Sequence, residues 1–282
     1  MFEDIEYTVE GVAAVIAFNR PEKMNAIRQR TIDDVIAAMD EAEKDDRVRA
    51  VIFTGKGRGF CAGMDLDVGF VPSPDADPET GEGVPPDLGG TVALRLFEAR
   101  KPLIGAVNGA AIGFGATVLL PMDFRLAAEG ARFGYVFSRR GIVSETCASW
   151  FLPRVVGMPA ALDWMLTGRI FDAGEAKAKG LVQDVLEPDQ LLPAALAIAD
   201  EIAANTSAVS VAVNRQLVWR MLGVDHPRIA HDLESRGLAA TFRMPDTAES
   251  TRSFLEKRAP KFGSTVADAD FMNAWWPPKP RS

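Results

Sequence analysis

The stretch PLIGAVNGAAIGFGATVLLPMDFRLAAEG, residues 102–130, decides the fold expected for this chain. Its first part, 102–109, is a short apolar run that predicts a buried strand, and 123–130 predicts a second strand with its turn. Between them, Gly113 and Gly115 predict a turn that leads into an apolar helix. A strand, a helix and a strand in succession are typical of an α/β protein.

The residues before this stretch repeat the same alternation. Residues 7–20 predict a strand, a turn at a glycine and a second strand, and 27–45 have the apolar spacing of an amphipathic helix. Residues 49–55 predict a buried strand, 56–66 a glycine-punctuated loop that enters a helix, and 91–100 a helix. The pattern therefore predicts an α/β core built from ββα and βα units.

From residue 144 onward the pattern is helical, with glycine or proline between segments. We expect a core over 1–200 and a helical C-terminal region over 201–282, with an irregular tail at 267–282. The stretch 71–90 is crowded with Pro, Gly and acids, which predicts an exposed, mobile insertion that could act as a lid. The predicted helices cover 144–157, 158–168, 172–180, 188–205, 207–222 and 247–260.

Composition excludes several classes of protein. The net charge of −8 and the lack of a long basic run argue against a nucleic-acid partner, and no apolar run reaches the roughly 18 residues of a membrane span. The acidic start lacks the features of a signal peptide. Cys61 and Cys147 have neither metal-ligand spacing nor a disulfide framework, and His226 and His231 are the sole histidines. We expect a reduced, cytoplasmic protein without a metal or membrane partner.

Two glycine loops carry the strongest chemical signal. Residues 60–66, FCAGMDL, and 108–117, NGAAIGFGAT, each follow a short buried strand. A glycine turn at a helix start leaves backbone N–H groups free to bind an oxygen that gains negative charge. Two such loops that meet would form an oxyanion hole. The alternative is that the glycines merely permit tight packing; GFG alone lacks the third glycine of a dinucleotide-binding motif.

Taken together, the two loops resemble the crotonase (enoyl-CoA hydratase/isomerase) superfamily. The resemblance extends over almost the whole chain and is carried by the segments 19–27, 51–66, 101–134, 151–157, 166–185 and 254–262. It implies a crotonase-like spiral of ββα units and a helical C-terminal trimerisation region. It also implies an acyl-CoA substrate, self-association as a homotrimer or a dimer of trimers, and no cofactor beyond the coenzyme A of the substrate.

The same resemblance assigns binding roles to individual residues. The oxyanion N–H groups fall on Met64 and on Phe114, where glycine is usual and where the ring is expected to narrow the acyl channel. The resemblance places contacts with coenzyme A at Lys23, Met24, Ala26, Ala62, Asp65 and Leu66. Lys23 could instead be a surface lysine without a role.

The acids of this chain depart from the hydratase pattern. Hydratases of the family use two glutamates, and the corresponding positions hold Thr117 and Phe137. Glu145, in FSRRGIVSETCASW, is the acid that remains near the thioester, as in the single-glutamate isomerases of the family. One carboxylate can take the proton α to a thioester and return one at the γ carbon. An apolar pocket would raise its pKa, and Phe137, Val143 and Trp150 are candidate walls.

Simpler interpretations of these residues remain open. Ser144 could cap a helix with Glu145 in its first turn, where acids are favoured. Arg139 and Arg140 could bind coenzyme A phosphates or an acidic acyl tail; the alternatives are a solvated face or salt bridges between subunits. Cys147 is best interpreted as a packed, inert thiol.

Three functions are therefore compared. The first is an enoyl-CoA isomerase with Glu145 as acid and base. The second is an enoyl-CoA hydratase or acyl-CoA hydrolase that uses Glu145 to activate water. The third is a non-catalytic acyl-CoA-binding trimer, which would keep the oxyanion loops after losing the hydratase acids.

Overall fold

A six-stranded sheet forms the centre of the molecule. The computed structural model of the chain describes residues 2–67 and 74–276. All neighbouring strands are parallel except the first pair, which confirms the strands predicted at 7–20, 49–55, 102–109 and 123–130. The strands follow one another across the sheet in the order β1 (Ile5–Glu10), β2 (Ala13–Phe18), β3 (Ala50–Gly55), β5 (Leu103–Val107), β7 (Phe124–Ala128) and β10 (Asp184–Leu186).

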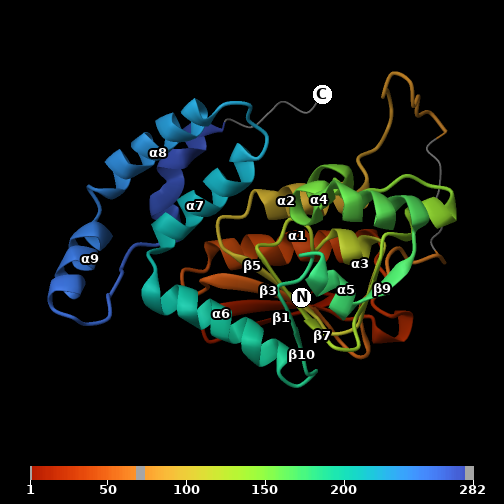
Figure 1. Cartoon of the computed structure of the whole chain (residues 1–282), viewed down its shortest axis with the longest axis horizontal. Helices are drawn as coiled ribbons and strands as arrows, with labels where there is room; N and C mark the ends of the chain where they lie inside the picture. Colours follow the sequence, from red (N-terminus) through yellow and green to blue (C-terminus); the bar gives the residue numbers. More distant parts are fainter. Residues whose placement is uncertain (1, 68–73, 277–282) are drawn as a thin grey trace.

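The inner strands are apolar on both faces because helices cover both sides of the sheet, as Figure 1 shows. One face packs on α1 (Gln29–Lys44) and α2 (Leu88–Phe97), within a cluster that includes Ile16, Phe53 and Leu96. The other face packs on α6 (Leu191–Asn205) through small side chains such as Ala195 and Ala199. Each inner strand therefore divides its side chains between two cores.

A second sheet of four short strands lies beside the first, in the order β4 (Gly59–Cys61), β6 (Ala110–Ile112), β8 (Arg132–Gly134) and β9 (Ile170–Asp172). It corrects the prediction for 110–122. The expected apolar helix is confined to α3 (Phe114–Thr117), because residues 110–112 pair with strands on both sides. Residues 62–67 likewise form no helix, and 68–73 lie outside the described residues.

The helix α4 (Ala148–Thr167) begins later than predicted. It is interrupted at Gly157, where φ is 77°, and this break separates the two helices predicted on either side of that residue. The predicted start at Ser144 is wrong because Thr146 and Cys147 have φ values of 62° and 54°, and such left-handed residues cannot continue a right-handed helix. A short helix, α5 (Ala173–Ala178), follows β9.

The C-terminal region forms a separate cluster of helices, α7 (Ala208–Met221), α8 (Pro227–Thr241) and α9 (Pro245–Leu255), which stands to one side of the sheets (Figure 1). The expected boundary at residue 200 falls inside α6, and the change of packing partner comes between α6 and α7. The buried Arg215 of α7 anchors this region to the core through a 2.7 Å ion pair with Asp123.

Two C-terminal segments differ from the sequence prediction. α8 has no counterpart among the predicted helices because it buries little, with Leu233 and Gly237 as its buried residues. The tail is not irregular over its first part: a 3₁₀ helix, η3, spans Val266–Trp275. Its buried residues Val266, Ala269 and Met272 recur every three positions, which is the period of a 3₁₀ helix. Residues 277–282 lie outside the described part of the chain.

Within residues 2–67 and 74–276, no single helix is both long and apolar enough to cross a membrane; α6 and α7 reach that length and composition together, with a bend of 116° between them. In the same residues, no group of three His, Cys, Asp or Glu side chains is arranged to hold a metal ion.

Candidate active site

A cavity of about 640 Å³ opens where the two glycine loops meet. Its wall is apolar apart from a few residues, and its charged members are Asp87, Arg140 and Glu145. Residues from 62–66 and 112–114 form one side, and 85–88 and 136–145 contribute the others. Ala62, Met64, Leu66, Phe114, Phe137, Val143 and Glu145, all predicted site residues, share this cavity.

The two glycine loops touch each other at Gly63, which has a φ of +100°. A Cβ atom at this position would lie 3.0 Å from the Ile112 carbonyl oxygen and 3.9 Å from the Cα of Gly113. Among the described residues, the backbone N–H groups of Met64 and Phe114 have no hydrogen-bond acceptor. These two N–H groups are therefore available to a carbonyl oxygen of a ligand.

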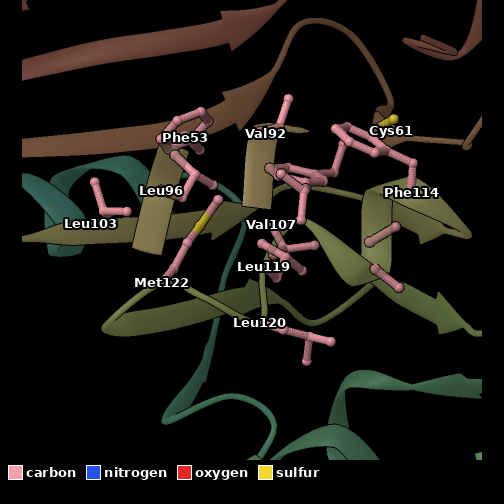
Figure 2. Packing of buried hydrophobic residues seen from close by; sticks show 14 of the residues in the cluster. Phe53, Cys61, Val92, Leu96, Leu103, Val107, Phe114, Leu119, Leu120 and Met122 are labelled. Carbon is pink, nitrogen blue, oxygen red and sulfur yellow. The ribbon is translucent and has the colours of Figure 1, made fainter. Parts of the chain in front are cut away.

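The side chain of Phe114 does not behave as the sequence led us to expect. Its ring is 3% exposed and packs edge-on against Phe18, with ring centroids 6.4 Å apart. Figure 2 shows it beside Cys61 within the buried cluster. The expected narrowing of the acyl channel by this ring is therefore wrong, because the ring is directed into the core.

Glu145 lies in the connection between η2 (Val136–Arg140) and α4, and not in the first turn of a helix. The alternative in which Ser144 caps the helix is also wrong, since the N-cap position is Cys147. The following residues, Thr146 and Cys147, are two consecutive non-glycine residues in the left-handed region. Such conformations are costly and tend to persist at functional sites.

The Glu145 carboxyl group is largely enclosed. Thr117 Oγ1 lies 3.2 Å from Glu145 Oε1 and 2.9 Å from Thr146 Oγ1. Gly89, in the first turn of α2, lies directly against the carboxyl group, since a Cβ there would overlap Glu145 Oε2. Burial raises the pKa of Glu145 to about 7; the Thr146 and Thr117 hydroxyls oppose this rise and the charge of Asp87 adds to it. No Lys or Arg among the described residues forms an ion pair with Glu145.

Asp87 is a site residue that the sequence analysis missed. It is the N-cap of α2, and its Oδ1 accepts hydrogen bonds from the N–H of Gly90 at 2.5 Å and of Thr146 at 3.0 Å. It stands in the Pro- and Gly-rich stretch 71–90, whose last residues, 88–90, belong to α2. An acid that precedes an apolar run is a recognisable N-cap signal, but Glu145 lies 58 positions further along the sequence, so their proximity is not visible in it.

Four of the predicted coenzyme A contacts lie outside the wall of this cavity. Lys23 forms an ion pair with Asp67, and the carbonyl of Met24 accepts a hydrogen bond from the N–H of Ala62 at 3.0 Å. Ala26 is buried. The Asp65 carboxylate pairs with Arg20 at 2.7 Å. The contacts of Lys23, Met24 and Asp65 join the segment 20–26 to residues 62–67, and the contacts of all four residues with coenzyme A stay predictions.

Trp150 does not contribute to the cavity wall formed by the described residues. Its ring packs against Phe97, at 5.9 Å between centroids, and against Phe151 at 4.7 Å. The Arg154 guanidinium lies over it, 4.1 Å from the ring centroid. Trp150 is therefore part of the contact between α2 and α4, because the helix start at Ala148 turns its side chain away from Glu145. In contrast, Val143 is 87% exposed beside the cavity.

The remaining polar candidates are two arginines and two cysteines. Arg140 lines the cavity, whereas the Nε of Arg139 donates to the Thr167 carbonyl at 2.8 Å. Burial raises the pKa of the Cys147 thiol and raises that of the fully buried Cys61 to about 12. Both thiols are poor nucleophiles in this state.

Two glycine loops that meet beside one enclosed acid, on paired sheets with a helical C-terminal region, define a class of protein that the comparisons with known sequences identify. The family Enoyl-CoA hydratase/isomerase matches residues 8–265, and the chain belongs to this family.

Individual relatives agree with this assignment. The chain is 39% identical to an enoyl-CoA hydratase, ACTT3, of Alternaria alternata over 90% of this chain and 83% of the relative. It is 32% identical to the 1,2-epoxyphenylacetyl-CoA isomerase of Escherichia coli over 93% of this chain and 99% of the relative. A crystal structure of a probable enoyl-CoA hydratase/isomerase from Mycobacterium abscessus superposes with a TM-score of 0.82, at 30% identity, over 93% of this chain and 99% of that one. The predicted crotonase-like α/β fold is thereby confirmed.

Proposed function

We propose that this chain is an enoyl-CoA isomerase that shifts a double bond of an acyl-CoA from the β,γ to the α,β position. The observation that carries the proposal is the state of Glu145, an acid with a pKa of about 7 that faces the same cavity as the Met64 and Phe114 loops. An acid with this pKa is divided between its two protonation states at neutral pH, so it can both accept and donate a proton.

In the proposed reaction the thioester oxygen binds to the N–H groups of Met64 and Phe114. The Glu145 carboxylate removes a proton from the α carbon, and the electron pair of that C–H bond forms a dienolate whose charge lies on the thioester oxygen. The protonated Glu145 then returns the proton to the γ carbon, and the double bond ends between the α and β carbons. The two N–H groups stabilise the dienolate more than the substrate, which lowers the barrier.

Hydration of an enoyl-CoA is the second candidate, because most of the named relatives are hydratases, ACTT3 at 39% identity among them. Against it, the two positions that carry the glutamates of the hydratase pattern hold Thr117 and Phe137, so Glu145 would activate water without them. The coenzyme A contacts, the homotrimer or dimer of trimers and the cytoplasmic location stay part of the proposal. A non-catalytic acyl-CoA-binding trimer is the outcome if no acyl-CoA is converted.

The test is a panel of 2-enoyl- and 3-enoyl-CoAs, with products followed by mass and by the absorbance of the conjugated thioester. Isomerisation leaves the mass unchanged, whereas hydration adds one water. In the Glu145→Gln variant we expect turnover to fall by about 10²–10⁴, the usual contribution of a general acid–base group. Rapid water addition that is untouched in Glu145→Gln would exclude the proposed reaction.

A further inference from the structure

Asp87 makes contacts that a simple helix cap does not need. Its Oδ1 accepts from Gly90 N–H, which caps α2, and also from Thr146 N–H, which belongs to the turn next to Glu145. A single oxygen thus joins the start of α2 to a turn whose two left-handed residues are unfavourable on their own. Asp87 also lines the same cavity as Glu145.

Few groups around Glu145 could offset the negative charge of Asp87. The groups that face it from its neighbours are Asp87 before α2, Thr117 of α3, Arg140 at the end of η2, Cys61 of β4 and Cys147 of its own turn. Of these, Asp87 and Arg140 carry a formal charge, and Arg140 is exposed to solvent. Two carboxyl groups held close together do not ionise independently, because the charge of one opposes ionisation of the other.

We propose that Asp87 is a positioning residue for Glu145: its carboxylate fastens the turn at Thr146 to the start of α2. Its negative charge also opposes ionisation of the neighbouring Glu145 carboxyl group. This inference rests on the proposed acid–base role of Glu145. The stretch 85–88 then belongs to the catalytic apparatus, although its composition is that of an exposed loop.

The physical consequence is a stronger base at the reacting carbons. A carboxylate that faces another negative charge gains more free energy when it takes up a proton, so it removes a carbon-bound proton more readily. The cap and the charge are separable, since an asparagine at position 87 keeps an oxygen for Gly90 and Thr146 but carries no charge.

The experiment titrates the full-length protein directly. Glutamate is labelled with ¹³C at the side-chain carboxyl, and the Glu145 resonance is assigned by its loss in Glu145→Gln. In the wild type we expect a midpoint of about 7. In Asp87→Asn the midpoint falls but stays above the ordinary 4.5, because burial, the largest cause, is unchanged. The acidic limb of kcat/KM then moves to lower pH, and the plateau falls several-fold.

Two further variants test whether the shift comes from the charge at position 87. Asp77→Asn removes the same charge from the same stretch, where the carboxylate binds the Thr80 hydroxyl at 2.8 Å, and its Glu145 midpoint stays at about 7. Asp87→Ser keeps a capping oxygen without a charge and shifts the midpoint in the same direction as Asp87→Asn. A midpoint of about 7 in both Asp87 variants would overturn the inference. Turnover retained in Glu145→Gln would instead overturn the proposed function, whatever the titration shows.

Discussion

Glu145 and Asp65 are acids in two loops of the same cavity region, yet their surroundings are opposite. Asp65 follows Met64 and pairs with Arg20 at 2.7 Å, and that pairing, the largest cause, lowers its pKa. Glu145 has hydroxyl groups and another acid for neighbours, and burial raises its pKa to about 7. The first acid is fixed in its charged form and the second is held near the midpoint of its titration.

The difference shows which acid can take part in chemistry. The Asp65 carboxylate also accepts the Asp67 N–H at 3.1 Å, so its oxygens are engaged in holding the first loop in shape. Arg20 also donates a 2.6 Å hydrogen bond to the Ala26 carbonyl, so it links the loop 60–66 to the segment 20–26. An acid whose oxygens are saturated by fixed donors has little tendency to accept a proton, whereas an enclosed acid without a cation does.

The largest expected effect comes from a substitution that moves Glu145 without altering it. In Gly89→Ala the new methyl group would overlap Glu145 Oε2, so the carboxyl group must shift. We expect kcat to fall by about 10², since displacements near 1 Å have effects of this size. Steady-state kinetics test this, with Leu94→Ala, an exposed position of the same helix, as the control. Unchanged kcat in Gly89→Ala would show that the position of Glu145 is not critical.

The second effect concerns stability and its dependence on pH. The pKa of Glu145 is about 7 in the folded chain and 4.5 is its ordinary value, so the folded state binds more protons between these pH values. The free energy of unfolding therefore loses a contribution as pH rises from 4.5 to 7, by at most about 3 kcal/mol. We expect no such loss in the Glu145→Gln variant, because glutamine has no carboxyl group to titrate.

Urea denaturation of both proteins at pH 5 and pH 8 measures the effect. The stability of Glu145→Gln relative to the wild type should increase between the two pH values. A difference that is the same at pH 5 and pH 8 would contradict the raised pKa and would make Glu145 resemble Asp65.

The smallest effect is expected for Asp65, and it should appear in the free energy of unfolding. In Asp65→Asn the partly buried Arg20 loses its nearest carboxylate and keeps Asp4 at 3.9 Å. We expect this change to cost about 2 kcal/mol, between the values for exposed and buried pairs. The loss is present at neutral pH and disappears in acid, because the pKa of Asp65 is lowered and its contribution vanishes as the carboxylate is protonated.

Chemical denaturation measures the stability lost in Asp65→Asn. The pH dependence of kcat distinguishes Asp65 from Glu145. The midpoint of the acidic limb in Asp65→Asn should coincide with that of the wild type. A shifted midpoint would mean that Asp65 also takes part in proton transfer, and the contrast between the two loops would fail.

Much of the fold followed from local patterns in the sequence. The buried strands β2, β3 and β5 are continuous apolar runs, and helix α1 has a clear apolar stripe. The three-residue strands β6 and β8 were missed because so short a segment has no periodicity and depends on its partners for its conformation. The 3₁₀ helix η3 was missed because its buried residues recur every three positions, which fits neither the period of an α-helix nor that of a strand.

The site was predictable where the signal is local and unpredictable where it depends on distant contacts. Gly63 and Glu145 stand in motifs that the family resemblance covers, so their shared cavity could be expected. Asp87 could not be found in this way, because composition describes its stretch as loop while its function depends on Thr146, 59 residues away. Trp150 was misplaced because the direction of its side chain follows from the start of α4 at Ala148.

The proposed oxygen-binding groups and the acid come from different parts of the fold. The backbone N–H groups of Met64 and Phe114 follow strands β4 and β6, so they do not depend on which side chains these residues carry. The acid comes from a connection outside both sheets, between η2 and α4. Substitutions in that connection can therefore change the proton chemistry proposed for this chain while the backbone N–H groups stay in place.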